Sequence, residues 1–174
     1  MINHIFPNGD KLEMKAIKRV AFASEETHCY QAKLYLNGKH IATVRNDGHG
    51  GADDQYPEGD FTYADVKALS DRCEAEMPKY FSKYVPDGME VDLEMWCQGA
   101  VDDYLLMQTM KKDMRAKVLA YDPADPKTLS QITFKGVRKL TDRHLHVAAD
   151  RYRDLIFLNV LPVDEAFAIY KEAH

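Results

Sequence analysis

The chain lacks the features of a membrane protein and of a secreted, disulfide-stabilised protein. It contains no run of about 18 apolar residues, so the sequence predicts no transmembrane helix. Its first 15 residues hold no apolar stretch of the kind found in secretory signals. Cysteine is scarce: Cys29, Cys73 and Cys97 stand alone, with no C-x-x-C pair. Three reduced thiols and a cytoplasmic location are therefore expected.

Motifs that would define a reaction are also missing. The sequence contains no P-loop, no G-x-G-x-x-G and no G-x-S-x-G, so no cofactor is expected. The net charge of −5 argues against a protein that binds nucleic-acid backbones. Charge is uneven, however. Residues 111–174 carry 12 Lys and Arg against 9 Asp and Glu (+3), and residues 1–110 carry 11 against 19 (−8). This distribution favours an ordinary solvated surface, with an anion-attracting C-terminal face as the alternative.

The strongest local signal is the pair Asn37-Gly38 between two strand-like runs. Such a pair is preferred in a type I′ hairpin because both turn residues need a positive φ. We expect strands over residues 29–36 and 39–45, preceded by a strand over residues 11–23. Together they predict an N-terminal antiparallel β-meander.

Two longer helices are expected after the meander. Thr62 and Asp65 have capping-box spacing, and apolar side chains then recur every three or four residues as far as Tyr84. Pro78 is expected to kink or divide this first helix. The second helix, over residues 90–115, has acids at its start and bases at its end, which complements the helix dipole.

The C-terminal third mixes short strands and helices. The pattern predicts strands near 117–121 and 129–137, a helix over 141–153, and a strand or helix extension at 155–158. Pro162 suits the first turn of a final helix, whose buried stripe is expected to comprise Val163, Phe167 and Tyr170. The expected fold class is α+β, in a single domain spanning residues 1–174.

A polar loop, RNDGHGG at residues 45–51, follows the hairpin. When a two-residue turn occupies positions 37–38, the numbers of paired residues sum to about 75. Tyr30 should then lie opposite Arg45, and the same register brings the segment SEETH, residues 24–28, opposite the loop. Two polar segments are thereby predicted to meet at the open end of the hairpin. The candidate ligand-binding residues are Glu25, Glu26, Thr27, His28, Arg45, Asn46, Asp47, Gly48, His49, Gly50 and Gly51.

Three interpretations of this cluster stay open. The glycines would let backbone N–H groups form an anion-binding concavity, and Arg45 could grip a phosphate or carboxylate, although the neighbouring acids repel anions. A divalent metal could be held by His28, Asp47, His49 and a Glu, but the spacing matches neither an EF-hand nor H-E-x-x-H, so no metal site is predicted. Alternatively, the glycines only turn the chain while acids and histidines pair across strands. The acidic segment that follows, residues 52–60, is expected to be a mobile connection to the first helix.

The segments FASEET (Phe22–Thr27) and NDGHGG (Asn46–Gly51) resemble those of a group of small uncharacterised proteins of phages and bacterial prophages. The stretches VDLEMW, KKDMRAKVL and NVLPVDEAFAIY also look similar in kind, so the likeness spans most of the chain. The resemblance implies a phage or mobile-element context, in the cytoplasm of a bacterial host, and no particular reaction.

Two functions of different classes are therefore expected. The favoured one is a phage-type accessory protein that acts by binding: it sequesters an anionic or nucleotide-derived ligand, or it inhibits a host protein, such as a defence factor. The alternative is a small metal-dependent or acid/base hydrolase, with Asp47 and His49 at its centre and Glu25 or Glu26 as base. A protein–protein module that acts through its helices is a third interpretation. Neither a membrane nor a nucleic-acid partner is expected, and a homo-oligomer is left open.

Overall fold

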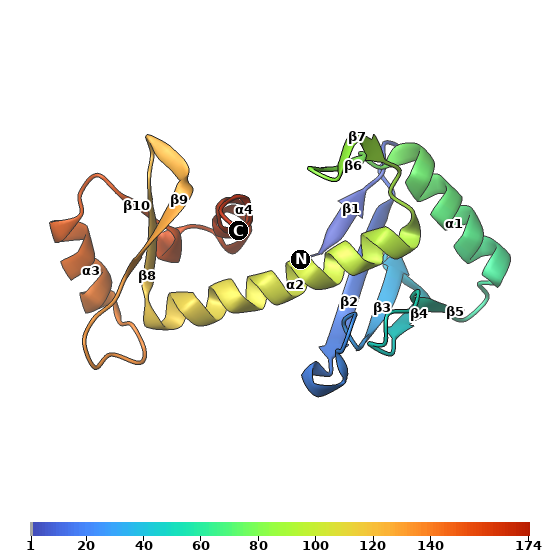
Figure 1. The fold of residues 1–174 in the computed structure, drawn as a ribbon, viewed down its shortest axis with the longest axis horizontal. Helices are drawn as coiled ribbons and strands as arrows, with labels where there is room; N and C mark the ends of the chain where they lie inside the picture. The colour runs from blue at the N-terminus through green and yellow to red at the C-terminus, as the bar shows by residue number, and fades with distance from the viewer. Residues whose placement is uncertain (1) are drawn as a thin grey trace. The chain divides into compact units, whose positions relative to one another are not determined.

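The computed structural model describes residues 2–174 and combines helices with antiparallel sheets, which confirms the α+β class (Figure 1). The chain forms two compact units, residues 1–104 (unit 1) and residues 105–174 (unit 2). The uneven charge follows this division. Unit 1 carries 11 Lys and Arg against 19 Asp and Glu, whereas unit 2 carries 12 against 9. No helix within residues 2–174 is long and apolar enough to span a membrane.

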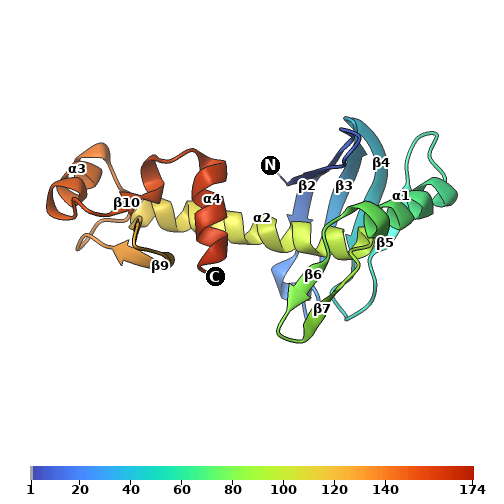
Figure 2. The ribbon, with the colours of Figure 1, turned by 90° about the horizontal axis from the view of Figure 1, so that it is seen from above.

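Unit 1 is built on a five-stranded antiparallel sheet whose strands follow chain order, as the predicted meander requires. The strands are β1 (Asn3–Ile5), β2 (Lys11–Arg19), β3 (Tyr30–Leu36), β4 (Lys39–Asn46) and β5 (Asp54–Pro57). Figure 2 shows β2, β3 and β4 side by side. The strand expected over residues 11–23 was too long, because it ends at Arg19 and Ala21–Ala23 form a 3-10 turn.

The strand β5 shows that the expectation of a mobile connection over residues 52–60 was wrong. Residues 54–57 pair with residues 42–45 of β4 and form the edge of the sheet. The side chains of β5 are exposed or half-buried. The strand therefore has no apolar alternation that would mark it in the sequence, and the backbone ladder holds it in place.

The turn between β3 and β4 is the predicted one. Asn37 and Gly38 have φ values of 51° and 79°, and a type I′ turn requires positive φ at both positions. The predicted register, however, holds only for the two pairs next to the turn. A bulge then shifts the register by one residue, so that Tyr30 lies opposite Asn46 and not opposite Arg45.

Burial explains the shifted register. Along β3, the buried side chains are those of Tyr30, Ala32 and Leu34. Directly opposite residues share a face of the sheet, and beyond the bulge their partners are Asn46, Val44 and Ala42, which are also buried. The predicted register would have placed the Arg45 guanidinium on this buried face. The shift leaves Arg45 exposed.

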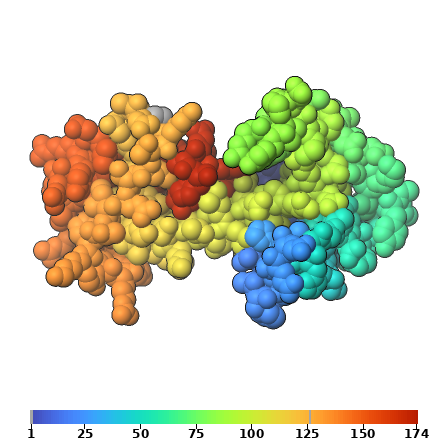
Figure 3. All heavy atoms as spheres, in the orientation of Figure 1, coloured from blue at the N-terminus to red at the C-terminus, as the bar shows by residue number. Residues whose placement is uncertain are grey.

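The first helix, α1 (Tyr63–Glu76), begins with the predicted capping box. The Thr62 hydroxyl accepts the backbone N–H of Asp65, and the Asp65 carboxylate accepts the backbone N–H of Thr62. The helix ends two residues before Pro78. Tyr80 and Tyr84, expected on its apolar face, lie instead in an exposed hairpin of β6 (Tyr80–Ser82) and β7 (Val85–Met89), seen in green in Figure 3.

The helix α2 (Leu93–Ala116) agrees with the helix expected over residues 90–115. Unit 2 also contains a three-stranded antiparallel sheet in the order β10-β8-β9. Its remaining elements are β8 (Val118–Asp122), β9 (Asp125–Ile132), α3 (Asp142–Arg151), β10 (Ile156–Phe157), the 3-10 turn Leu158–Val160 and α4 (Val163–Glu172). Of the two alternatives for residues 155–158, the strand is the one that forms.

The strand β8 contributes to two separate apolar clusters because successive side chains of a strand point to opposite faces. Leu119 packs in one cluster with Met110 and Tyr170. Val118 packs in the other with Ala148 of α3. These clusters hold α3, α4 and the end of α2 around the small sheet.

The buried stripe predicted for α4 was partly wrong. Tyr170 is buried and Phe167 is half-buried, but Val163 is exposed. Val163 is the first residue of the helix, and the residue that is buried in this part of α4 is Ala166.

Candidate functional site

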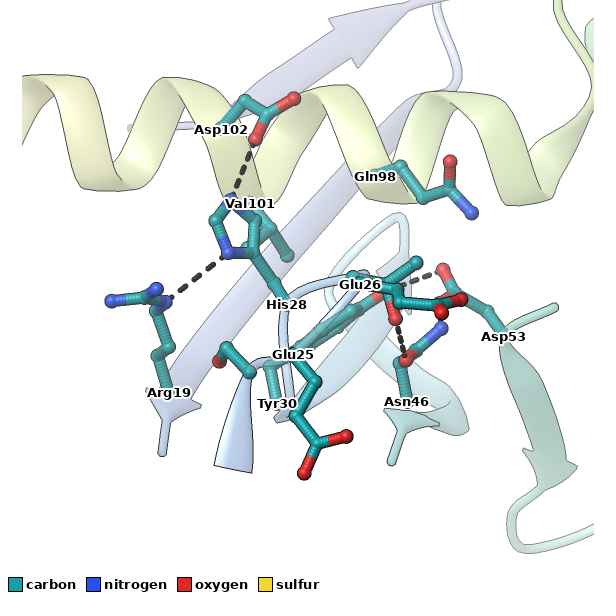
Figure 4. A pocket seen from close by; sticks show the side chains of 12 residues that line it. Arg19, Glu25, Glu26, His28, Tyr30, Asn46, Asp53, Gln98, Val101 and Asp102 are labelled. Carbon is teal, nitrogen blue, oxygen red and sulfur yellow. Dashed lines mark hydrogen bonds and ion pairs between the residues drawn. The ribbon is translucent and has the colours of Figure 1, made fainter. Parts of the chain in front are cut away.

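A pocket of about 320 Å³ lies in unit 1 at the open end of the β3–β4 hairpin (Figure 4). It is formed by the segment SEETH, by residues at the facing ends of β2, β3 and β4, and by one face of α2. The lining residues are Arg19, Ser24, Glu25, Glu26, Thr27, His28, Tyr30, Asn46, Asp53, Gln98, Val101 and Asp102.

The segment SEETH and the loop NDGHGG meet, as predicted, although they do not form a strand ladder. The carbonyl oxygen of Gly48 accepts the backbone N–H groups of Glu25, Glu26 and Thr27 at 3.0, 2.9 and 3.3 Å. The Thr27 hydroxyl donates to Asn46 Oδ1 at 2.7 Å. The strand pairs expected for residues 25–28 are absent because β3 begins only after this segment.

Gly48 is required by both space and conformation, and Gly50 by conformation, because the atom that its Cβ would meet is the movable end of the Glu26 side chain. Gly48 has a φ of +89°, and a Cβ atom there would lie 2.0 Å from the carbonyl oxygen of Ala23. Gly50 has a φ of +86°, and its Cβ would lie 2.1 Å from the Glu26 carboxylate. Gly51, in contrast, has open space around it. The close approach of the two segments and the backbone conformation therefore account for Gly48 and Gly50 without a ligand.

Tyr30, Asp53 and Asn46 form a buried polar chain at the base of the pocket. The Tyr30 hydroxyl donates to Asp53 Oδ2 at 2.5 Å, and Asn46 Nδ2 donates to Asp53 Oδ1 at 3.0 Å. Tyr30 is only 3% exposed, Asp53 9% and Asn46 4%. Burial raises the pKa of Asp53 above its ordinary value, although both hydrogen bonds favour the charged form. Burial also raises the pKa of Tyr30.

A second carboxyl group, that of Glu94 on α2, lies next to this chain. Glu94 Oε1 accepts the backbone N–H of Asp53 at 3.3 Å and the side-chain amide of Gln98 at 3.1 Å. Burial raises the pKa of Glu94, and the nearby charge of Asp53 raises it further. Two neighbouring carboxyl groups therefore have raised pKa values, that of Asp53 in the pocket lining and that of Glu94 behind it.

His28 is held between Arg19 and Asp102 at the other end (Figure 4). Arg19 Nε donates to His28 Nδ1 at 3.2 Å, and His28 Nε2 lies 3.0 Å from Asp102 Oδ1. Because a guanidinium can only donate, Nδ1 must accept, and the ring proton of neutral His28 sits on Nε2 and is donated to Asp102. Both ring nitrogens are thus engaged, so His28 holds the wall of the pocket and has no free nitrogen for a ligand.

Arg45, Asp47 and His49 lie outside the pocket lining. Arg45 Nη2 lies 2.6 Å from Asp47 Oδ1, and His49 Nδ1 lies 3.3 Å from Glu25 Oε2. All four side chains are more than half exposed. Five of the predicted site residues therefore line the pocket (Glu25, Glu26, Thr27, His28 and Asn46) and the other six lie beside it (Arg45, Asp47, Gly48, His49, Gly50 and Gly51).

Seven lining residues were not among the candidate site residues, although the first of them lies in the predicted segment SEETH: Ser24, Arg19, Tyr30, Asp53, Gln98, Val101 and Asp102. The sequence did contain a signal for two of them, Gln98 and Asp102. Gln98 and Asp102 are four residues apart, so they share a face of α2, where they flank the buried Val101. A polar pair beside a buried residue on a helix face indicates contact with a partly polar neighbour. The sequence did not indicate that this neighbour is the segment SEETH.

The structure also bears on the metal interpretation. Across residues 2–174, no group of three or more His, Cys, Asp or Glu side chains is placed so as to hold a metal ion. His28 and His49, proposed as ligands of one ion, have different partners, Asp102 and Glu25.

Comparisons of the chain with protein-family models, with curated proteins and with solved structures gave no match.

Proposed function

We propose that the chain is a binding protein of the phage accessory type, and that its unit 1 pocket holds a positively charged group. The group is an ammonium or a guanidinium, carried by a small ligand or by a Lys or Arg side chain of a host protein. The resemblance of FASEET and NDGHGG to phage proteins supports the accessory role. The chemistry of the pocket lining supports the charge of the ligand.

The observation that carries the proposal is that the carboxylate of Glu26 has no partner within the described part of the chain. Its carboxylate lines the pocket, and among residues 2–174 it has no hydrogen bond or ion pair. Glu25, Asp53 and Asp102 contribute further carboxyl groups, against the single guanidinium of Arg19. Glu26 is exposed to solvent, and a cationic ligand that donates hydrogen bonds would pair with its carboxylate and reduce the repulsion among these acids.

An anionic ligand, which the sequence favoured, would find few donors in this pocket. Arg45 is engaged by Asp47 and does not line the pocket. The N–H groups of residues 25–27 converge on one point, as in an anion-binding nest, but the carbonyl oxygen of Gly48 occupies that point. The N–H group of Gly48 is also bound, to Asn46 Oδ1 at 2.8 Å. These contacts favour a cationic ligand over an anionic one.

Isothermal titration calorimetry with defined probes tests the proposal. The probes are agmatine, N-acetyl-lysine methylamide and N-acetyl-arginine methylamide, with acetate and phosphate as anions for comparison. We expect at least one cation to bind, and Glu26→Gln to weaken it about tenfold because a charge-assisted hydrogen bond is lost. Glu74→Gln is the matched control, since Glu74 is an exposed glutamate on α1 outside the pocket. Binding of the anions alone, or equal effects of the two substitutions, would refute the proposal.

An acid/base hydrolase is the second candidate, and the raised pKa of Asp53 favours it. A carboxyl group that holds its proton above the ordinary range can act as a general acid, and such groups cluster at active sites. This role would move the centre of the reaction away from Asp47 and His49, which lie outside the lining. Turnover of p-nitrophenyl esters, phosphates or glycosides that is lost in Asp53→Asn would support the hydrolase. Absence of turnover on all three substrate classes would oppose it.

A further inference from the structure

We infer that unit 2 carries a separate binding site for a small phosphomonoester, located between the end of α2 and the loop before α3. A pocket of about 240 Å³ lies there. Its walls include Met114 and Arg115 from α2, Lys139 and Leu140 from the loop, and Asp142 at the start of α3. All of these residues belong to unit 2, so the inference does not depend on the function proposed for unit 1.

The walls of this pocket are fixed by hydrogen bonds. The backbone N–H of Leu140 donates to the carbonyl oxygen of Arg115 at 2.7 Å, which ties the loop to the end of α2. Asn159 Nδ2 donates to the carbonyl oxygens of Met114 and Lys117 at 2.9 and 3.0 Å. The last carbonyl groups of a helix ordinarily repel anions. Here donors from the protein already occupy two carbonyls of the last turn of α2, those of Met114 and Arg115, and the carbonyl of Lys117 just after it, which reduces that repulsion.

Two cations from different elements border the same pocket. Arg115 comes from α2 and Lys139 from the loop, and neither side chain has a hydrogen bond or ion pair among the residues that the structure describes. The only acidic side chain in the lining is Asp142. Isolated surface cations are usually only solvated, but these two line one cavity, and the backbone hydrogen bond between Leu140 and Arg115 holds the two elements that carry them together.

Charge and size point to the phosphomonoester class. A phosphomonoester carries a charge of about −1.5 to −2 at pH 7, which two cations match, and a guanidinium can bind it with two parallel hydrogen bonds. The pocket is smaller than the roughly 300–1,000 Å³ typical of drug-sized ligands, so the occupant is small. Met114, Leu140 and Leu145 supply apolar walls, which favour a phosphate on a small apolar or aromatic body over the free ion.

Titration with phenyl phosphate, inorganic phosphate and phenol, followed by calorimetry, tests this inference. We expect phenyl phosphate to bind more tightly than either of the others. Arg115→Gln and Lys139→Gln should each weaken it about tenfold because each removes one charge-assisted contact. Asp142→Asn should tighten it several-fold because it removes the one opposing charge in the lining. If these residues had only a structural role, Asp142→Asn would not increase the affinity for phenyl phosphate.

Two controls complete the experiment. Lys112→Gln removes an exposed cation from α2 outside the lining and should leave the affinity unchanged. Glu26→Gln, in the unit 1 pocket, should also leave it unchanged, which separates this inference from the function proposed above. Equal losses in Lys112→Gln and Arg115→Gln would mean general attraction to a basic surface and would overturn the inference. So would an absence of phenyl phosphate binding, or an unchanged affinity in Asp142→Asn.

Discussion

Asn46 lies opposite Tyr30 in the β3–β4 ladder, and its side-chain amide links the segment SEETH of the unit 1 pocket to the loop NDGHGG. Its Oδ1 accepts the Thr27 hydroxyl at 2.7 Å and the Gly48 N–H at 2.8 Å, while its Nδ2 donates to Asp53 at 3.0 Å. Only a side chain with both donors and acceptors can make these contacts, so an amide fits here and a carboxylate does not.

Removal of the Thr27 hydroxyl should therefore destabilise unit 1. Thr27→Val keeps the shape of the side chain but leaves Asn46 Oδ1 with one partner fewer, at an expected cost of about 1 kcal/mol in the free energy of unfolding. Urea denaturation followed by circular dichroism measures the change. Thr27→Ser, which keeps the hydroxyl, is the control, and its free energy of unfolding should fall clearly less than that of Thr27→Val. Equal losses in the two variants would show that the hydroxyl is not what matters.

Substitution of Gly48 should be more damaging than substitution of a glycine with the same backbone conformation in open space. Gly9 and Gly48 have φ values of 90° and 89°, but a Cβ at Gly9 meets nothing within 4 Å. Gly9→Ala should cost about 1–2 kcal/mol through backbone strain alone. Gly48→Ala should cost more, because its Cβ would clash with the Ala23 carbonyl oxygen. Comparable losses in thermal or urea denaturation would contradict the close packing of this loop.

Asp53 should make the protein less stable as the pH rises. Burial raises its pKa above the ordinary value of 3.8, so the folded state keeps the proton to a higher pH than the unfolded chain does. The free energy of unfolding therefore falls as the pH rises from about 4 through the raised pKa of the folded state. Glu94, whose pKa is also raised by burial, acts in the same direction.

The test compares Asp53→Asn with the wild-type chain in urea between pH 4 and pH 8. The variant should gain stability relative to the wild type as the pH increases, because its amide has no charge to bury. Asp60→Asn, at a fully exposed position, should track the wild type. A stability difference between Asp53→Asn and the wild type that is the same at every pH would rule out this role for Asp53.

Asp10 should have the opposite dependence on pH. Hydrogen bonds from Asn37, Arg72 and Asn8 lower the pKa of Asp10 to about 2, so the folded state favours its charged form. The stabilisation is present above the ordinary pKa of 3.8 and is lost as the pH falls through about 2. Asp10→Asn should thus be less stable than the wild type at pH 7, and the difference should shrink at acidic pH.

The matched control for this prediction is Asp71→Asn, which removes an exposed partner of Lys67 on α1. It should have little effect at any pH, since exposed ion pairs contribute little. Urea denaturation from pH 2 to pH 7 gives both profiles. If Asp10→Asn were as much less stable than the wild type at pH 2 as it is at pH 7, the lowered pKa of Asp10 would not be the cause of the difference.

The features that the sequence predicted well are those with local causes. The Asn37-Gly38 turn depends on the φ preferences of two residues, and the start of α1 depends on Thr62 and Asp65. The fold class follows from such signals together with the change in apolar periodicity. The meeting of SEETH and NDGHGG was predicted because the two segments lie at the two ends of one hairpin, where residues can be paired by counting from the turn.

The features that were missed depend on partners far along the chain. β5 is an edge strand of mostly exposed residues, and it forms because β4 offers it a free ladder. The hairpin of β6 and β7 includes Pro86 and Gly88, which are unfavourable inside a sheet but tolerated in a two-stranded hairpin, where both strands are edges. Likewise, Asp102 lines the pocket because α2 packs beside it, although Asp102 lies 74 residues after its partner His28 in the sequence.

The bulge in β4 has a chemical consequence that reaches beyond the register. If the same sequence paired in a regular ladder without the bulge, Arg45 would stand opposite Tyr30, on the buried face beside Asp53. With the bulge, the neutral amide of Asn46 takes that place and the guanidinium points to solvent. The bulge therefore keeps a permanent positive charge away from the buried carboxyl group of Asp53, and the interior of unit 1 at this point is held together by neutral hydrogen-bonding side chains around one acid.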